Sequence, residues 1–188
     1  MANRSQTQAM LDRTCAMWDD PLVYHYQELQ DVPEDVPSLF LAGPSSRDDV
    51  LEFKWRPLAV HFLREYGFKG IIVVPEPREN DWTFKATFPT EIVSWERKRL
   101  LLQVKKAVFW IPRHQTQLPG RVTNTELGFL AGMAYADPAR YKQRLVWGYP
   151  QTAWKVKSED HWVHATAGIE PWYHLETMCE YVAGCSFT

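Results

Sequence analysis

The stretch AVFWIPRHQTQLPGRVTNTELGFLAG, residues 107–132, decides the fold. It opens with a short apolar run that ends at a proline, and a loop with a Pro119-Gly120 turn follows. The sequence Thr123-Asn-Thr-Glu126 then predicts the start of a helix. A strand that leads into a helix is the repeating unit of an open α/β sheet, whose ligands bind beyond the carboxyl ends of the strands.

Three further apolar runs predict buried strands, and each ends at a glycine or a proline: residues 38–43, 70–75 and 144–149. Helical patterns lie between and after these runs, over residues 50–66, 90–106 and 171–183. Short apolar strands that alternate with helices are typical of a parallel sheet covered on both faces. We therefore predict a doubly wound α/β fold of four or five strands, the fifth being a short strand near residues 162–165.

The chain is predicted to have two parts. Residues 1–37 read as an N-terminal extension, because Pro21, Pro33 and Pro37 do not suit a long helix. We expect this extension to wrap the surface or to begin with a short helix, and we assign it no chemistry. Residues 38–188 are predicted to form one domain, since a chain of 188 residues suffices for a single full core.

Composition excludes several function classes. A net charge of −2 gives no electrostatic case for binding nucleic acid or a membrane surface. No apolar run approaches the ~20 residues that span a bilayer, and the first residues lack the apolar core of a secretion signal. Three cysteines without a CxxC pattern argue against a disulfide framework. These features together predict a cytoplasmic protein.

Several well-known site motifs are missing from the sequence. It has no GxGxxG dinucleotide fingerprint, no GxxxxGK[ST] phosphate loop and no GxSxG nucleophile elbow. The one close histidine pair, His161 and His164, has no cysteine near it, which favours a surface or core role over metal binding. No metal site is predicted.

The first predicted strand ends in Gly43-Pro44-Ser45-Ser46-Arg47. A glycine at this point would let a ligand approach the backbone. The two hydroxyls, the arginine and the start of the next helix would suit a phosphate or a sugar hydroxyl. The equally supported alternative is that Ser45 or Asp48 caps that helix.

Glu126 is open to two interpretations. The pattern Thr123-x-x-Glu126 is a capping box, and the pattern alone favours this structural role. Glu96 lies 30 positions earlier on the preceding predicted helix, where a lone glutamate is usually solvated. Two carboxylates that converge on one pocket can nevertheless divide the work of glycosidic cleavage, one attacking the sugar carbon and the other protonating the leaving group.

A series of short motifs resembles the nucleoside 2-deoxyribosyltransferase-like family. In order they are FLAGP, Trp55-Arg56, GIIVVPEP, SWE, VFWIPR, LPG, TNTELG and WGYP, and they cover about residues 38–150. The resemblance implies a flavodoxin-like (Rossmann-like) sheet with strand order 2-1-3-4-5. It also implies cleavage of the N-glycosidic bond of 2′-deoxynucleosides or of nucleoside 5′-monophosphates, with transfer of the sugar to another base or to water.

Site residues follow from the same resemblance. The family's nucleophilic glutamate falls on Glu126, and its acid, often an aspartate, falls on or close to Glu96. Relatives often have Ala-Asp where this chain has Lys105-Lys106. The predicted substrate-binding residues are Gly43, Ser45, Ser46, Arg47, Trp82, Trp95, Pro119, Gly120 and Asn124. Among the nine tryptophans, those at 82, 95 and 110, together with Phe84, are candidates to stack on the base.

The expected partners are therefore a nucleoside or nucleotide and a free base. No cofactor is expected. In the family that the sequence resembles, a neighbouring subunit often completes the active site, which implies a homodimer or a higher homo-oligomer. Two alternatives remain from the residues themselves. One is a nucleotide-binding or sensing module without turnover, and the other is a glycohydrolase that acts on NAD or another ribonucleotide.

Overall fold

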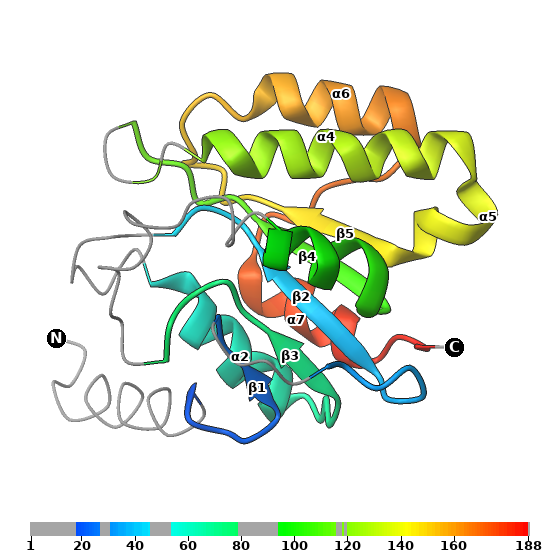
Figure 1. Cartoon of the computed structure of the whole chain (residues 1–188). Coiled ribbons are helices and arrows are strands. Elements are labelled where there is room, and N and C mark those ends of the chain that lie inside the picture. The colour runs from blue at the N-terminus through cyan, green and yellow to red at the C-terminus, as the bar shows by residue number, and fades with distance from the viewer. Residues whose placement is uncertain are drawn as a thin grey trace, which may run out of the picture.

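The computed structural model describes residues 18–26, 31–45, 54–78, 94–115, 118 and 120–187. Within these residues, five strands form one parallel sheet in the order β1-β3-β2-β4-β5 (Figure 1). The strands are β1 (Val23–Tyr24), β2 (Ser38–Ala42), β3 (Ile71–Val73), β4 (Lys106–Trp110) and β5 (Leu145–Gly148). The four longer strands are buried along their whole length, as expected for a sheet covered on both faces.

Helices cover both faces of the sheet, so the predicted doubly wound α/β class is confirmed (Figure 1). One face carries α2 (Trp55–Glu65) and α7 (Leu175–Ala183). The other carries α4 (Arg121–Ala136), α6 (Lys157–Ala167) and a helical segment that we call helix 94–103, which ends in the π-helical η3 (Lys98–Gln103). Two short pieces, α5 (Pro138–Tyr141) and η4 (Lys142–Arg144), lead from α4 into β5.

The predicted fifth strand is wrong, and the strand order changes with it. Residues 162–165 lie inside α6, because Val163 and Ala167, four positions apart, form its buried helical face. The fifth strand is instead β1, which pairs with β3 at the opposite edge. The remaining strands keep the expected relative order, and beyond β5 the described residues contribute only an isolated parallel bridge from Trp172 to Gly148.

Two helices begin later than predicted. The first turn of α2 contains Pro57, a position where a missing N–H costs nothing, and Gly67 follows its end with a φ of 88°. Pro171 does not open α7, whose N-cap is His174. No helix in the described ranges combines the length and the apolar character needed to cross a bilayer.

Candidate functional site

The carboxyl ends of all five strands lie at one edge of the sheet, because the strands are parallel. Tyr26 follows β1, Ser45 follows β2, Glu76 follows β3 and Arg113 follows β4. The Tyr26 N–H donates to the backbone oxygen of Glu76 at 3.2 Å, which joins the ends of β1 and β3. The sequence therefore brings polar side chains from separate loops to the edge where open α/β sheets bind ligands.

Arg56 ties the ends of β2 and β3 together. It is 1% exposed, and its guanidinium donates to the backbone oxygens of Leu41 at 2.9 Å and Gly43 at 2.5 Å. It also donates to Ser45 Oγ at 3.0 Å and to Glu76 Oε1 at 2.5 Å. The predicted substrate-binding hydroxyl of Ser45 is thus held in place by a buried arginine and keeps its own proton to donate.

Gly43 is required by packing within the protein. A Cβ at this position would lie 2.2 Å from the backbone oxygen of Trp110 and 2.6 Å from the Trp55 ring, and its φ is +153°. The missing Cβ therefore makes room for β4 and α2, and the expected contact of this glycine with a ligand stays a prediction. Trp110, proposed to stack on a base, is 5% exposed and belongs to the core.

The capping box predicted for α4 is also wrong. Gly120, in the left-handed conformation with φ 60°, is the N-cap, so the helix begins before Thr123. Thr123 is 4% exposed inside the first turn, and Glu126 lies half-buried in the second turn. The helix starts early because the glycine supplies a backbone conformation that other residues rarely adopt. Helix capping is thereby removed as the explanation of Glu126.

The start of α4 packs against the other strand ends. A Cβ on Gly120 would lie 3.6 Å from Pro44 and 3.7 Å from Nε of Arg113, so the loops after β2 and β4 meet at this glycine. That Nε is buried and has no hydrogen-bond partner in the described part of the chain. The first turns of α4 are therefore fixed beside the end of β2.

Asn124, a predicted substrate-binding residue, is part of an internal polar network. Its Oδ1 accepts a hydrogen bond from Arg113, and its Nδ2 donates to Glu159 Oε1 at 2.9 Å. Arg113 also donates to this Glu159 oxygen at 2.9 Å. Burial would raise the pKa of Glu159, but hydrogen bonds from Arg113, its own backbone and Ser158 outweigh burial and lower the pKa. The network anchors α6 to the start of α4.

A pocket of about 290 Å³ continues from this network along the groove between α4 and α6. Asn124 and Glu159 lie at its polar end, while Gly128, Gly132 and Trp162 contribute to its largely apolar wall. This groove lies on the side of α4 that faces α6, whereas helix 94–103 lies on another side of α4 (Figure 1).

Trp95 and Glu96 lie among the described residues of helix 94–103. The Trp95 ring makes an edge contact with Tyr26, at 5.3 Å between centroids, and a tilted contact with Phe40 at 6.3 Å. Its Nε1 is buried without a hydrogen-bond partner in the described ranges. Trp95 therefore packs the helix that carries the half-buried Glu96 against β2 and against Tyr26, which follows β1, and leaves an indole N–H that an acceptor on a bound molecule can satisfy.

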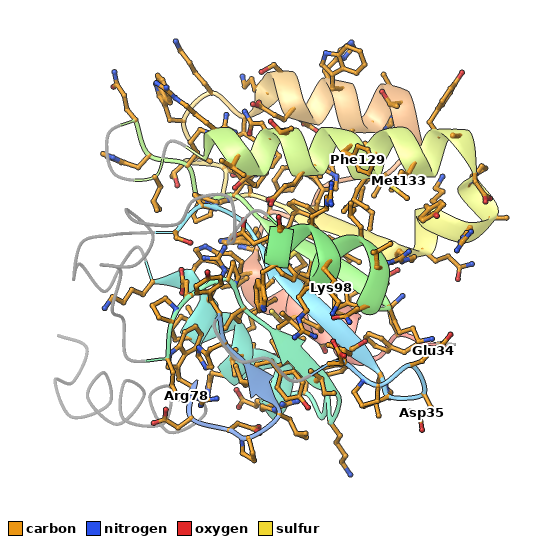
Figure 2. The ribbon with its side chains drawn as sticks, in the orientation of Figure 1. Glu34, Asp35, Arg78, Lys98, Phe129 and Met133 are labelled. Carbon is orange, nitrogen blue, oxygen red and sulfur yellow. The ribbon has the colours of Figure 1, made fainter. Side chains whose placement is uncertain are left out.

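Glu126 faces the same region from α4. Figure 2 shows Phe129 and Met133 on the side of α4 turned toward helix 94–103. Met133 follows Glu126 by seven residues, almost two helical turns, so the two side chains leave the helix on one side. Both predicted catalytic carboxylates therefore come from helices on the same sheet face.

Four predicted binding residues, Ser46, Arg47, Trp82 and Pro119, lie outside the described residues. The sequence alone indicated no role for Arg56, Glu76, Arg113 or Glu159. Their hydrogen bonds join the segments at the carboxyl ends of the strands. A signal was present for the two arginines, because each occurs next to apolar or proline residues that bury it. The described residues include no group of three metal-binding side chains.

No family model matches the chain, and no curated protein sequence matches it.

Proposed function

We propose that the protein cleaves the N-glycosidic bond of (deoxy)nucleosides or their 5′-monophosphates and transfers the sugar to another base or to water. The observation that carries the proposal is the placement of two half-buried carboxylates at one end of the sheet. Glu126 lies in the second turn of α4 and Glu96 on helix 94–103, and these helices cover the same face. Most enzymes that cleave glycosidic bonds use a pair of carboxyl groups as their catalytic groups.

The proposed chemistry is a double displacement with retention. A carboxylate oxygen of Glu126 forms a bond to C1′ while the bond from C1′ to the base nitrogen breaks. The electron pair leaves with the base, and Glu96 supplies the proton that the departing nitrogen needs. A second base or a water molecule then attacks C1′ and releases Glu126, while Glu96 accepts a proton from the incoming group.

Substrate binding is proposed to use the loop after β2 and the aromatic pair beside β1. Arg56 donates a hydrogen bond to Ser45 Oγ, so the proton of that hydroxyl is available to a sugar or phosphate oxygen. The half-buried Trp95, which packs on Tyr26, offers aromatic surface and one unsatisfied N–H next to Glu96. Arg56 acts here as a positioning residue, since its own donors are engaged with protein atoms.

The test is an assay of base release and base exchange. The protein is incubated with deoxynucleosides, ribonucleosides and their monophosphates, each with and without a second free base, and products are separated by chromatography. We expect Glu126→Gln to lose at least about a thousandfold in rate, as removal of a nucleophile typically does. Intact-protein mass spectrometry should detect a glycosyl adduct on the wild type and none on Glu126→Gln.

The matched control is Glu180→Gln, which changes an exposed glutamate on α7, on the opposite sheet face. Because Glu126 does not cap α4, its replacement by glutamine should leave the thermal midpoint nearly unchanged. The proposal is wrong if no nucleoside or nucleotide releases base, or if Glu126→Gln is as active as the wild type. Binding of nucleotides without turnover would instead establish the sensing alternative.

A further inference from the structure

A second large cavity lies at the amino ends of the strands, away from the candidate site. It has a volume of about 670 Å³ and is bordered by the start of β4, by α5, by η4 and by the C-terminal residues. The proposed function leaves this cavity unused. Its size falls within the range of about 300–1,000 Å³ that is typical of small-molecule sites.

Among the residues that the structure describes, four cationic side chains and one acidic side chain, Glu34, line this pocket. The cations are Lys105, Lys106, Arg140 and Arg144. Within the described ranges, none of the four forms an ion pair with a carboxylate. Figure 2 places Glu34 at this lower right end of the molecule, beside the solvent-exposed Asp35. Among the described residues, the cationic side chains of the pocket therefore outnumber its acidic ones.

Two of these cations are held at the pocket by backbone atoms. Lys106 is 7% exposed, and its Nζ donates to the backbone oxygen of Gln143 at 2.9 Å and lies 5.2 Å from the centre of the Phe187 ring. Arg144 donates to the backbone oxygens of Val104 at 2.9 Å and Leu101 at 3.2 Å. These contacts orient both charges and leave donors on each available to another acceptor.

Burial and nearby side chains shift the pKa values of two of these cations. Burial lowers the pKa of Lys106 and also that of Arg144. The neighbouring Tyr141 raises the pKa of Arg144, and the charge of Arg140 lowers it. A cluster of like charges at a concave surface is a typical binding site for an anion of opposite charge.

We propose that this pocket binds a nucleotide-like polyanion, an organic molecule with at least two phosphate charges. Four cations exceed what a single carboxylate needs, and the volume exceeds what an inorganic anion fills. Leu102, which is 79% exposed, and the Phe187 ring supply apolar surface for the uncharged part of such a molecule. Because the basic residues line a cavity and the whole chain carries a net charge of −2, a small ligand fits better than a nucleic-acid strand.

The test is calorimetric titration of the full-length protein with ADP, inorganic pyrophosphate and adenosine. We expect ADP to bind saturably, pyrophosphate to compete with it, and adenosine to give no heat at this site. Lys105→Gln/Arg140→Gln should weaken ADP binding at least about tenfold, because two charge-assisted contacts are lost. The matched control, Lys69→Gln/Lys157→Gln, removes the same charge from exposed positions outside the pocket and should bind ADP as the wild type does.

Thermal unfolding of the variants and ADP binding to Glu126→Gln serve as controls for this titration. Both double variants change side chains that are exposed or half-buried, so their thermal midpoints should match that of the wild type. ADP binding to Glu126→Gln should be unchanged, which separates this pocket from the carboxyl-edge site. Absence of ADP binding, or equal affinities of the pocket variant and the control variant, would overturn the proposal.

Discussion

Arg56 and Glu76 form an ion pair, 2.5 Å between Nη1 and Oε1, that joins the carboxyl ends of β2 and β3. The arginine side chain is fully buried, and the glutamate side chain is 16% exposed. Neither charge is well solvated, so each depends on the other and on the backbone oxygens that Arg56 also contacts. The pair therefore holds residues 43–45, which follow β2, next to the end of β3.

Arg56→Met is expected to lower the free energy of unfolding by about 3–5 kcal/mol, because the change strands a partly buried carboxylate. Urea denaturation at neutral pH measures the change. In the double variant Arg56→Met/Glu76→Gln, part of the loss should return, since no uncompensated charge remains. A loss below about 1 kcal/mol for Arg56→Met would show that the pair contributes little, as exposed pairs do.

Two glycine substitutions should act in opposite directions. Gly43→Ala is expected to destabilise the protein by about 3 kcal/mol, the cost of a serious overpacking, because its Cβ would lie 2.2 Å from the Trp110 backbone oxygen. Gly128→Ala, in the exposed interior of α4 with no atom within 4 Å of a Cβ, should stabilise by about 0.5–1 kcal/mol. Thermal and urea unfolding of both variants tests this difference in sign.

Glu159 should make stability depend on pH in the acid range. Its folded-state pKa is below the ordinary value of 4.5, so the carboxylate form stabilises the fold. This stabilisation is complete above about pH 4.5 and is lost as the pH falls through the lower folded-state pKa. The stability difference between the wild type and Glu159→Gln should therefore be constant near neutral pH and shrink below pH 4.5. Glu180→Gln, the exposed control, should show no such shrinkage.

Glu96→Gln should slow base release most for leaving groups that need a proton. We expect a loss of about 100-fold or more with ordinary deoxynucleosides, the typical contribution of a general acid. The loss should be much smaller with a 7-methylated purine nucleoside, whose base already carries a positive charge. Equal losses with both substrates would assign Glu96 to binding rather than proton transfer.

The two cysteines of the C-terminal region should differ in reactivity. Cys179 lies on the fully buried face of α7, and burial with the nearby Glu176 raises the pKa of its thiol to about 12. Cys185 is half-buried. Labelling with iodoacetamide at pH 8, followed by peptide mass spectrometry, should modify Cys185 in the native state and Cys179 only at the rate of unfolding. Rapid native labelling of Cys179 would contradict the packing of α7 described here.

The sequence predicts the four longer strands well because each is a continuous apolar run closed by glycine or proline. It misses β1, because two residues carry no periodicity and their pairing with β3 is a long-range contact. It assigns residues 162–165 to a strand because a short apolar segment does not distinguish a strand from a buried helix face. These errors concern short elements, whose structure is decided by tertiary packing.

The candidate site is less predictable than the fold for a similar reason. Thr123 and Glu126 fit a capping box in sequence, but the left-handed Gly120 starts the helix three residues before Thr123. The sequence suggests that Asn124 can bind a ligand. In the structure its Oδ1 accepts from Arg113 and its Nδ2 donates to Glu159, and these partners come from other segments of the chain. Local spacing cannot indicate such partners, because they approach only when the chain has folded.

The two outermost strands of the sheet, β1 and β5, are short, which limits strand pairing between chains. At one edge β1 presents only two residues, and at the other Trp172 occupies the backbone groups of Trp147 and Tyr149 with bonds of 3.0 and 2.8 Å. Long unpaired edge strands are templates for intermolecular strand addition and amyloid growth. The native sheet offers little such template, so we expect aggregation to begin only after β1 has detached and uncovered β3.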